Sequence, residues 1–133
     1  KVLPIICVDV VVCNSRGEYL LVKRTNEPLK GEWWVIGGRV HKGERLEKAV
    51  VRKVRQETGI QAKDMQPIGY FEIITDSNPF GLPFKYHAMS VVFKIQIDDT
   101  QKIRLDNQSA AFKFAKKLPA DFRFKPFTHH QIK

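Results

Sequence analysis

The stretch 38–60, GRVHKGERLEKAVVRKVRQETGI, decides the fold of this 133-residue chain because it holds the longest helical pattern. Gly43 begins the pattern, and Gly59 is placed to end it in the left-handed conformation that glycine adopts readily. At 100° per residue, four apolar side chains share one stripe of the helix: Leu46, Ala49, Val50 and Val54. The pattern therefore predicts a helix that packs on a core through this stripe, with Glu44 and Glu47 in its first turns.

Glu57 interrupts the apolar stripe. It also lies in the last turn of the predicted helix, where the helix macrodipole disfavours a negative charge by a few tenths of a kcal/mol to about 1 kcal/mol. A carboxylate at such a position needs a nearby cation. Lys53, four residues earlier on the same side of the helix, is one candidate, and a metal ion is the other. The helical pattern alone does not choose between them.

The rest of the chain is mostly strand-forming sequence, in runs at 5–13, 18–23, 33–36, 68–75 and 87–97. The first run is apolar almost throughout, which predicts a strand buried on both faces, and residues 14–17 predict a tight turn into the second. Gly37 and Gly38 allow the backbone a positive φ and a close approach to a ligand. We expect one α+β or mixed α/β domain over residues 1–133, with room near its end for a short strand and a terminal helix.

Charge is the unusual feature of the composition. The chain has 23 Lys and Arg against 14 Asp and Glu, a net charge of +9, and residues 101–133 alone hold 8 basic and 2 acidic side chains. Such an excess suggests an anionic partner, which can be a nucleotide, a nucleic acid or an acidic membrane surface. Aromatic residues recur every two or three positions in the same part of the chain, which defines a basic tail at about 116–133.

Several classes of protein do not fit the sequence. No apolar run approaches the ~20 residues that span a bilayer, and the opening run contains Pro4 and Asp9 and does not read as a signal peptide. Cys7 and Cys13 would lie roughly 20 Å apart on one strand, which is too far for a disulfide. Two lone thiols favour a reducing compartment, so we expect a cytoplasmic protein. No Cys/His spacing typical of a zinc site is present.

Seven residues of the opening stretch share one spaced pattern: Gly38, Glu44, Arg52, Val54, Glu57, Gly59 and Ile60. The pattern resembles the Nudix box, G-x5-E-x7-R-E-U-x-E-E-x-G-U, in which U is aliphatic. Lys53 and Gln56 depart from the box, which has glutamate at both positions. The resemblance implies a Nudix fold of the α+β class, an α/β/α sandwich in which helices enclose a mixed sheet and the box forms loop–helix–loop.

The two departures weaken the carboxylate cluster with which a typical Nudix hydrolase binds two or three divalent ions, because hard cations need oxygen donors. The pattern is similar to that of the GDP-mannose mannosyl hydrolases, which lack the same glutamates and displace GDP from the anomeric carbon of the sugar. Residues 14–18, 23–26 and 37–40 extend this likeness, which covers roughly residues 6–114. It implies a Mg²⁺-dependent hydrolase of a nucleoside-diphosphate sugar such as GDP-mannose.

The resemblance also implies ligands for the metal and the substrate. A single Mg²⁺ would be held by three oxygen donors: the Gly37 carbonyl, the Glu57 carboxylate and the Gln108 side chain. The diphosphate would be bound at Gly38, Arg24 and Arg39, where the arginines neutralise charge on the leaving group. Both arginines have a plain alternative as solvated surface charges.

Four residues are candidates for catalysis: Asp9, Arg39, Arg52 and His87. Asp9 matches a strand aspartate that is important to the site in this branch, and its burial in an apolar strand would be costly without a partner. Arg52 can instead brace the box by pairing with a glutamate. The family's general base is a histidine where Ser109 stands here, and a serine hydroxyl does not titrate near neutrality. His87 is the nearest remaining imidazole, although a histidine at a strand start also commonly binds backbone or solvent.

Two other functions remain open. The chain can be an ordinary pyrophosphohydrolase of nucleotide derivatives, which would require metal ligands outside the box. It can also be a non-catalytic module that binds a nucleotide sugar or RNA, for which Ser109 and the two alanines after it are the argument. RNA rests on the basic tail alone, and solvation explains such a tail more simply, so we expect a small-molecule partner and no nucleic acid or membrane. Members of this branch are often dimers, which makes a homodimer one expected arrangement.

Overall fold

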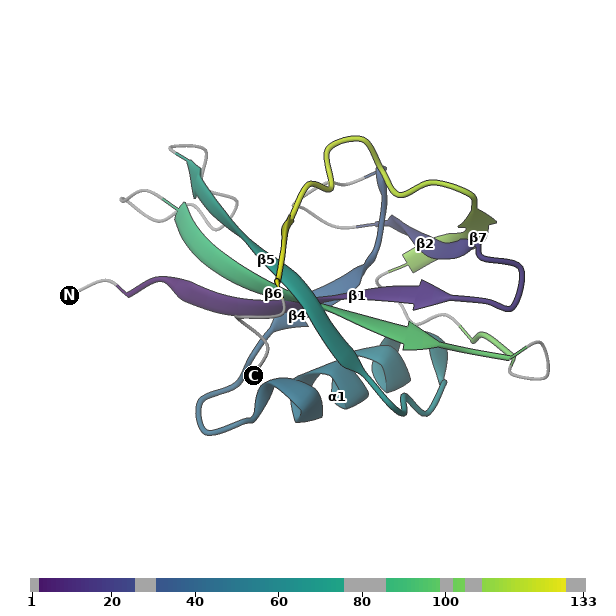
Figure 1. Ribbon diagram of the computed structural model, residues 1–133, viewed down its shortest axis with the longest axis horizontal. Helices are drawn as coiled ribbons and strands as arrows, with labels where there is room; N and C mark the ends of the chain where they lie inside the picture. The colour runs from purple at the N-terminus through teal and green to yellow at the C-terminus, as the bar shows by residue number, and fades with distance from the viewer. Residues whose placement is uncertain (1–2, 26–30, 76–85, 99–101, 105–108, 129–133) are drawn as a thin grey trace.

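The computed structural model describes residues 3–25, 31–75, 86–98, 102–104 and 109–128. Figure 1 shows the elements found among them, in chain order: β1 Ile5–Cys13, β2 Tyr19–Arg24, β3 Trp33–Trp34, β4 Ile36–Arg39, α1 Leu46–Thr58, β5 Gln66–Thr75, β6 Tyr86–Gln96, β7 Ser109–Ala115 and β8 Lys125–Pro126. Four of the predicted strands are confirmed to within about two residues at each end. The run at 33–36 is divided between β3 and β4, and the short strand expected near the end of the chain is β7.

The strands form a mixed sheet in the order β3-β2-β1-β6-β5-β8, with β4 also paired to β1 and β7 to β2. Neighbouring strands are antiparallel except β1 and β6, which run parallel with Asp9 opposite Val92. The hairpin between β1 and β2 turns at Asn14, whose side-chain oxygen accepts hydrogen bonds from the backbone N–H groups of Arg16 and Glu18. The mixed sheet that the resemblance implied is therefore confirmed.

Helix α1 lies on one face of this sheet, as Figure 1 shows. Its predicted stripe is confirmed: Ala49, Val50 and Val54 are fully buried, and Leu46 packs at the margin of the same cluster. The stripe meets the side chains on one face of β1, which are Val8, Val10 and Val12. Apolar burial along this helix and strand therefore fixes which side of α1 faces the sheet.

The helix ends as predicted and begins later than predicted. Gly59 adopts a left-handed φ of 77°, and its N–H donates to the carbonyl of Arg55. The first helical residue is Leu46, and Gly43, at φ 81°, belongs to the turn that precedes the helix. Glu44 consequently lies in this turn, where its side chain is available to the loop rather than to the helix.

The other face of the sheet is covered by the C-terminal segment 116–128, drawn from yellow-green to yellow in Figure 1. Phe122 is 5% exposed and packs in a second cluster with Val11, Val35 and Val92. The α+β Nudix fold that the resemblance implied is confirmed, with one difference in how the sheet is covered. Among the described residues α1 is the only helix, and an aromatic segment takes the place of a helix on the second face.

Both cysteines lie on β1 and neither is in a disulfide, as predicted. Burial raises the pKa of the Cys7 thiol to about 11, so this side chain stays protonated at neutral pH and is a poor nucleophile. None of the described helical segments has the length and apolar character needed to cross a membrane.

Candidate functional site

Asp9 is the centre of the candidate site. It lies in the middle of β1 and is 9% exposed, among side chains that are otherwise apolar. Ser90 of the neighbouring strand β6 donates a hydrogen bond to the Oδ2 atom of Asp9, and Trp34 of β3 also hydrogen-bonds to this carboxylate. The burial cost that the sequence predicted for Asp9 is therefore offset by two polar partners that the sheet supplies.

The surroundings of Asp9 shift its acidity strongly. Burial raises the pKa of Asp9 to about 7, against hydrogen bonds from Ser90 and Trp34 and the positive charge of Arg24, which lower it. The negative charge of Glu57 raises it further. A carboxyl group with such a pKa can hold or release a proton near neutrality, and perturbed carboxyl groups of this kind concentrate at functional sites.

The two glycines of β4 let other groups approach closely. A Cβ atom at Gly37 would lie 2.5 Å from Oδ1 of Asp9 and 2.9 Å from the carbonyl oxygen of Val8, and one at Gly38 would lie 2.5 Å from Cε of Lys53. The positive φ expected here is wrong, because neither glycine is among those with positive φ. Glycine is needed at Gly37 because the Asp9 side chain occupies the space that any Cβ would fill.

Glu57 supplies a second buried carboxylate to the site. It is 2% exposed and lies in the last turn of α1, as predicted. Its influence on the pKa of Asp9 means that the two carboxylates are electrostatically coupled. Glu57 lies at the negative end of the helix dipole, and its charge adds to that of the dipole, so this end of α1 favours a cation.

Arg24 and Arg39 approach this region from two sides. Arg24 ends β2, and its charge acts directly on Asp9. Arg39 ends β4, is exposed and lies opposite Cys7 of β1. Both predicted substrate-binding arginines therefore lie close enough to β1 to act on its side chains, Arg24 on Asp9 and Arg39 on Cys7.

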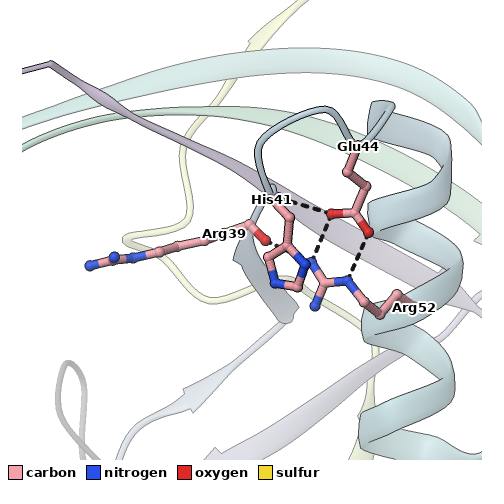
Figure 2. Close-up of polar contacts among 4 residues, drawn as sticks. All are labelled: Arg39, His41, Glu44 and Arg52. Atoms are coloured by element: carbon pink, nitrogen blue, oxygen red, sulfur yellow. Dashed lines mark hydrogen bonds and ion pairs between the residues drawn. The ribbon is translucent and has the colours of Figure 1, made fainter.

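Arg52 braces the loop before α1, which is the structural role that the sequence offered as its alternative. Its Nε donates to Oε2 of Glu44 at 2.8 Å, and its Nη2 donates to Oε1 of Glu44 at 3.0 Å and to the carbonyl oxygen of Arg39 at 2.8 Å. Glu44 also accepts the backbone N–H of His41. Figure 2 shows this network, with the side chain of Arg39 directed away from it.

The network changes the acidity of its own carboxylate. Hydrogen bonds from Arg52 and from the His41 backbone hold the pKa of Glu44 at about 2, and the same pairing raises the pKa of Arg52. Both charges are therefore present throughout the physiological range. A catalytic role for Arg52 stays a prediction, whereas its role in holding the end of β4 to the helix is visible in these bonds.

The remaining predicted residues lie elsewhere. His87 contacts Glu72 of β5, with 3.3 Å between Nε2 and Oε2, and strand alternation puts it on the opposite face of β6 from Ser90. The structure therefore does not bring His87 beside Asp9, and its catalytic role stays a prediction. Gln108 lies outside the described residues, and of Ser109 only its backbone place at the start of β7 is described.

Sequence reasoning missed two partners of Asp9. Ser90 and Trp34 belong to strands far from β1 along the chain, and each looks like an ordinary strand residue on its own. A signal was present only for Ser90, which is a polar residue inside the apolar run AMSVVF at 88–93. Its significance depends on the parallel pairing of β1 with β6, which no local pattern reveals.

The chemistry of this donor set suits a hard divalent cation. Carboxylate and carbonyl oxygens are the ligands that Mg²⁺ prefers, and Glu57 and Gly37 offer one of each. In the part of the chain that the structure describes, no group of three or more His, Cys, Asp and Glu side chains is arranged to hold a metal.

Comparison with known proteins agrees with this geometry. The NUDIX domain family model matches residues 3–128. The low-salt glycan biosynthesis protein Agl8 of Haloferax volcanii is 34% identical over 111 residues, covering 83% of this chain and 69% of that protein. The ADP-ribose pyrophosphatase of Methanocaldococcus jannaschii is 35% identical over 94 residues, covering 71% of this chain, which spans about half (52%) of that relative.

Solved structures share the fold. The MutT NUDIX hydrolase of Burkholderia pseudomallei superimposes with a TM-score of 0.75 over 98% of this chain and 94% of that one, at 23% identity. Three observations lead to one conclusion: the mixed sheet with helix α1 in the described part of this chain, the spaced pattern over residues 38–60, and the family match over residues 3–128. The chain belongs to the Nudix hydrolase family.

Proposed function

We propose that this chain is a metal-dependent hydrolase of a nucleoside-diphosphate sugar of the GDP-mannose type, which releases the nucleoside diphosphate by attack of water at the anomeric carbon. The observation that carries the proposal is the composition of the buried side of α1. Glu57 is the buried carboxylate of this helix, while a lysine and a glutamine stand at the two other box positions that usually hold glutamate. This donor set suits one metal ion rather than a cluster.

Nudix hydrolases generally act with divalent ions such as Mg²⁺. In this chain the Gly37 carbonyl and the Glu57 carboxylate would hold the ion, and Gln108 is the third proposed ligand. When bound, the metal would withdraw charge from the diphosphate leaving group. With one ion there is no second metal to activate a water for attack at phosphorus. This favours reaction at the sugar carbon, where the diphosphate is the leaving group and is not itself attacked.

The chain's own residues would bind and orient the substrate. Arg24 and Arg39 would contact the diphosphate and stabilise the charge that develops as the bond from carbon to the phosphate oxygen breaks. Asp9, with its pKa near 7, would hold or accept a proton at the buried end of the site. Arg52 would keep the end of β4 in place for both tasks through the Arg39 carbonyl.

The likeness to a glycan biosynthesis protein supports a sugar nucleotide as the substrate class. In the proposed reaction, water forms a new bond to the anomeric carbon and releases one proton, the bond from that carbon to the phosphate oxygen breaks, and the diphosphate leaves with that oxygen and with the bonding electron pair. Hydrolysis in ¹⁸O-labelled water with Mg²⁺ and a panel of nucleotide sugars tests this directly by mass spectrometry. We expect the label in the free sugar; label in the nucleotide would overturn attack at carbon.

A second candidate is a pyrophosphohydrolase of nucleotide derivatives, which the likeness to an ADP-ribose pyrophosphatase favours. It predicts a nucleoside monophosphate as a product, so including ADP-ribose in the same panel separates the two reactions. Tight Mg²⁺-dependent binding of a nucleotide sugar without turnover would instead support a binding module, and the absence of a histidine at Ser109 is the feature that favours this outcome.

A further inference from the structure

Lys53 departs from the Nudix box in charge as well as in shape, and its side chain takes an unusual course. It leaves α1 and passes across Gly38 of β4, where a Cβ atom would lie 2.5 Å from its Cε, 2.9 Å from its Cδ and 3.1 Å from its Nζ. The side chain is half-buried. The whole outer end of the lysine, including the ammonium group, therefore lies against the strand rather than extending into solvent.

The ammonium group lies over Gly38, one of the residues that the resemblance assigns to the diphosphate. Gly38 follows Gly37, which contacts Asp9, and Lys53 stands one helical turn before Glu57 on the same side of α1. The positive charge is thus held close to the metal ligands proposed above. The next residue of β4 is Arg39, whose side chain is directed to the other face of the strand, away from α1.

The sequence offered Lys53 as one of two candidate cations for Glu57, the other being a metal ion. Two ion pairs in the described part of the chain join Arg52 with Glu44 and His87 with Glu72, and Lys53 takes part in neither. Holding a long, flexible side chain against a strand costs conformational entropy. A compact ammonium group held in this way is suited to bind an oxygen of a phosphate group.

We propose that Lys53 is a substrate-binding residue whose ammonium group contacts a non-bridging oxygen of the diphosphate. In this arrangement a fixed cation of the protein supplies positive charge where other Nudix proteins use a glutamate to bind an additional metal ion. Gly38 is needed for this arrangement, because only a residue without a side chain leaves room for the side chain of Lys53 to cross β4. The proposal rests on the proposed function and names Lys53 as a cation that binds the diphosphate of the substrate.

Binding of nucleotides without turnover tests the proposal separately from the reaction. GDP, ADP and the corresponding nucleosides are titrated by calorimetry into the full chain with Mg²⁺ present. Lys53→Met removes the charge and keeps the length of the side chain, and we expect the dissociation constants of the diphosphates to rise about tenfold or more. Nucleoside affinity should not change. Lys48→Met, which removes an exposed charge of the same helix, is the matched control and should bind as the wild type does.

Gly38→Ala provides a second test because the new Cβ would displace the end of Lys53, the flexible group nearest to it. We expect Gly38→Ala to weaken diphosphate binding in the wild-type chain and to have little further effect in the Lys53→Met chain, as coupled residues require. Equal diphosphate affinity of wild type and Lys53→Met would overturn the proposal while leaving the proposed function intact. A wild-type chain that binds no diphosphate would overturn both.

Discussion

Arg52 and Glu44 are joined by two hydrogen bonds, of 2.8 Å from Nε to Oε2 and 3.0 Å from Nη2 to Oε1. A third bond from the same guanidinium reaches the carbonyl of Arg39 at the end of β4. The pair thus ties the loop before α1 to the strand that carries the two glycines, and it does so with a planar fork of donors that lysine cannot reproduce.

This pair predicts a pH-dependent stability. The pKa of Glu44 is held at about 2, below its ordinary value of 4.5, so the stabilisation is complete above about pH 4.5 and is lost as the pH falls towards 2. We expect Glu44→Gln to lower the melting temperature by a few degrees at pH 7. The difference from wild type should shrink steadily between pH 4.5 and 2 in thermal melts followed by circular dichroism. A difference that does not change with pH would contradict the assignment.

Removal of the hydroxyl group beside Asp9 should destabilise the protein. Ser90 is 3% exposed and donates to the Asp9 carboxylate, so Ser90→Ala is expected to cost about 1–3 kcal/mol in the free energy of unfolding. The loss should be larger at pH 8 than at pH 5, because the hydrogen bond favours the charged form of a group whose pKa is about 7. Urea unfolding of the wild type and of Ser90→Ala at the two pH values measures this loss in the free energy of unfolding. In an Asp9→Asn background the loss should be smaller and independent of pH.

Glu57→Gln tests the metal ligand. Since hard cations prefer a carboxylate to an amide oxygen, we expect the increase in melting temperature that Mg²⁺ gives the wild type to be mostly lost in this variant. Hydrolytic activity should fall by about 100-fold or more. Glu47→Gln changes an exposed glutamate of the same helix and serves as the control, with both properties unchanged. Retention of the Mg²⁺ effect in Glu57→Gln would show that the ion binds elsewhere.

The aromatic layer can be tested at its centre. Phe122 is 5% exposed, and its ring lies 5.4 Å from that of Trp34 and 5.7 Å from that of Phe71. Phe122→Ala should lower the free energy of unfolding by about 3–5 kcal/mol, as expected for a large side chain removed from a packed site. Phe112 is 41% exposed, and Phe112→Ala should cost less than about 1 kcal/mol in the same denaturant titration. A loss for Phe122→Ala as small as that for Phe112→Ala would mean that the C-terminal segment contributes little to the core.

Local patterns in the sequence were sufficient for the elements that are held by local rules. The stripe of α1 follows from its period, its end follows from the left-handed glycine at Gly59, and Glu57 was identified because a charge interrupts an apolar stripe. The burial of β1 on both faces over residues 8–13 follows from its apolar run, which only Asp9 interrupts. Each of these conclusions needed only residues of the same helix or strand, or residues directly beside it in the sequence.

Contacts between distant segments could not be predicted in this way. The C-terminal segment was interpreted as a solvated tail because of its positive charge. In the structure its aromatic side chains determine where it packs, and its lysines and arginines remain at the surface. Gly37 and Gly38 were assigned a backbone role, and the structure shows that neighbouring side chains occupy their space. The partners of Asp9 were missed for the same reason, since Ser90 is far from it in sequence.

The parallel pairing of β1 with β6 has a consequence for how the protein folds. Residues 5–13 pair with residues 88–96, which are distant in the sequence. The chain therefore has to close a long loop to form the centre of its sheet. Closure of such a loop costs entropy before any contact repays it, and domains dominated by distant pairings fold slowly. Asp9 meets Ser90 only after this closure. An N-terminal fragment emerging from a ribosome therefore carries the whole Nudix box and still lacks the hydroxyl group that binds its central carboxylate.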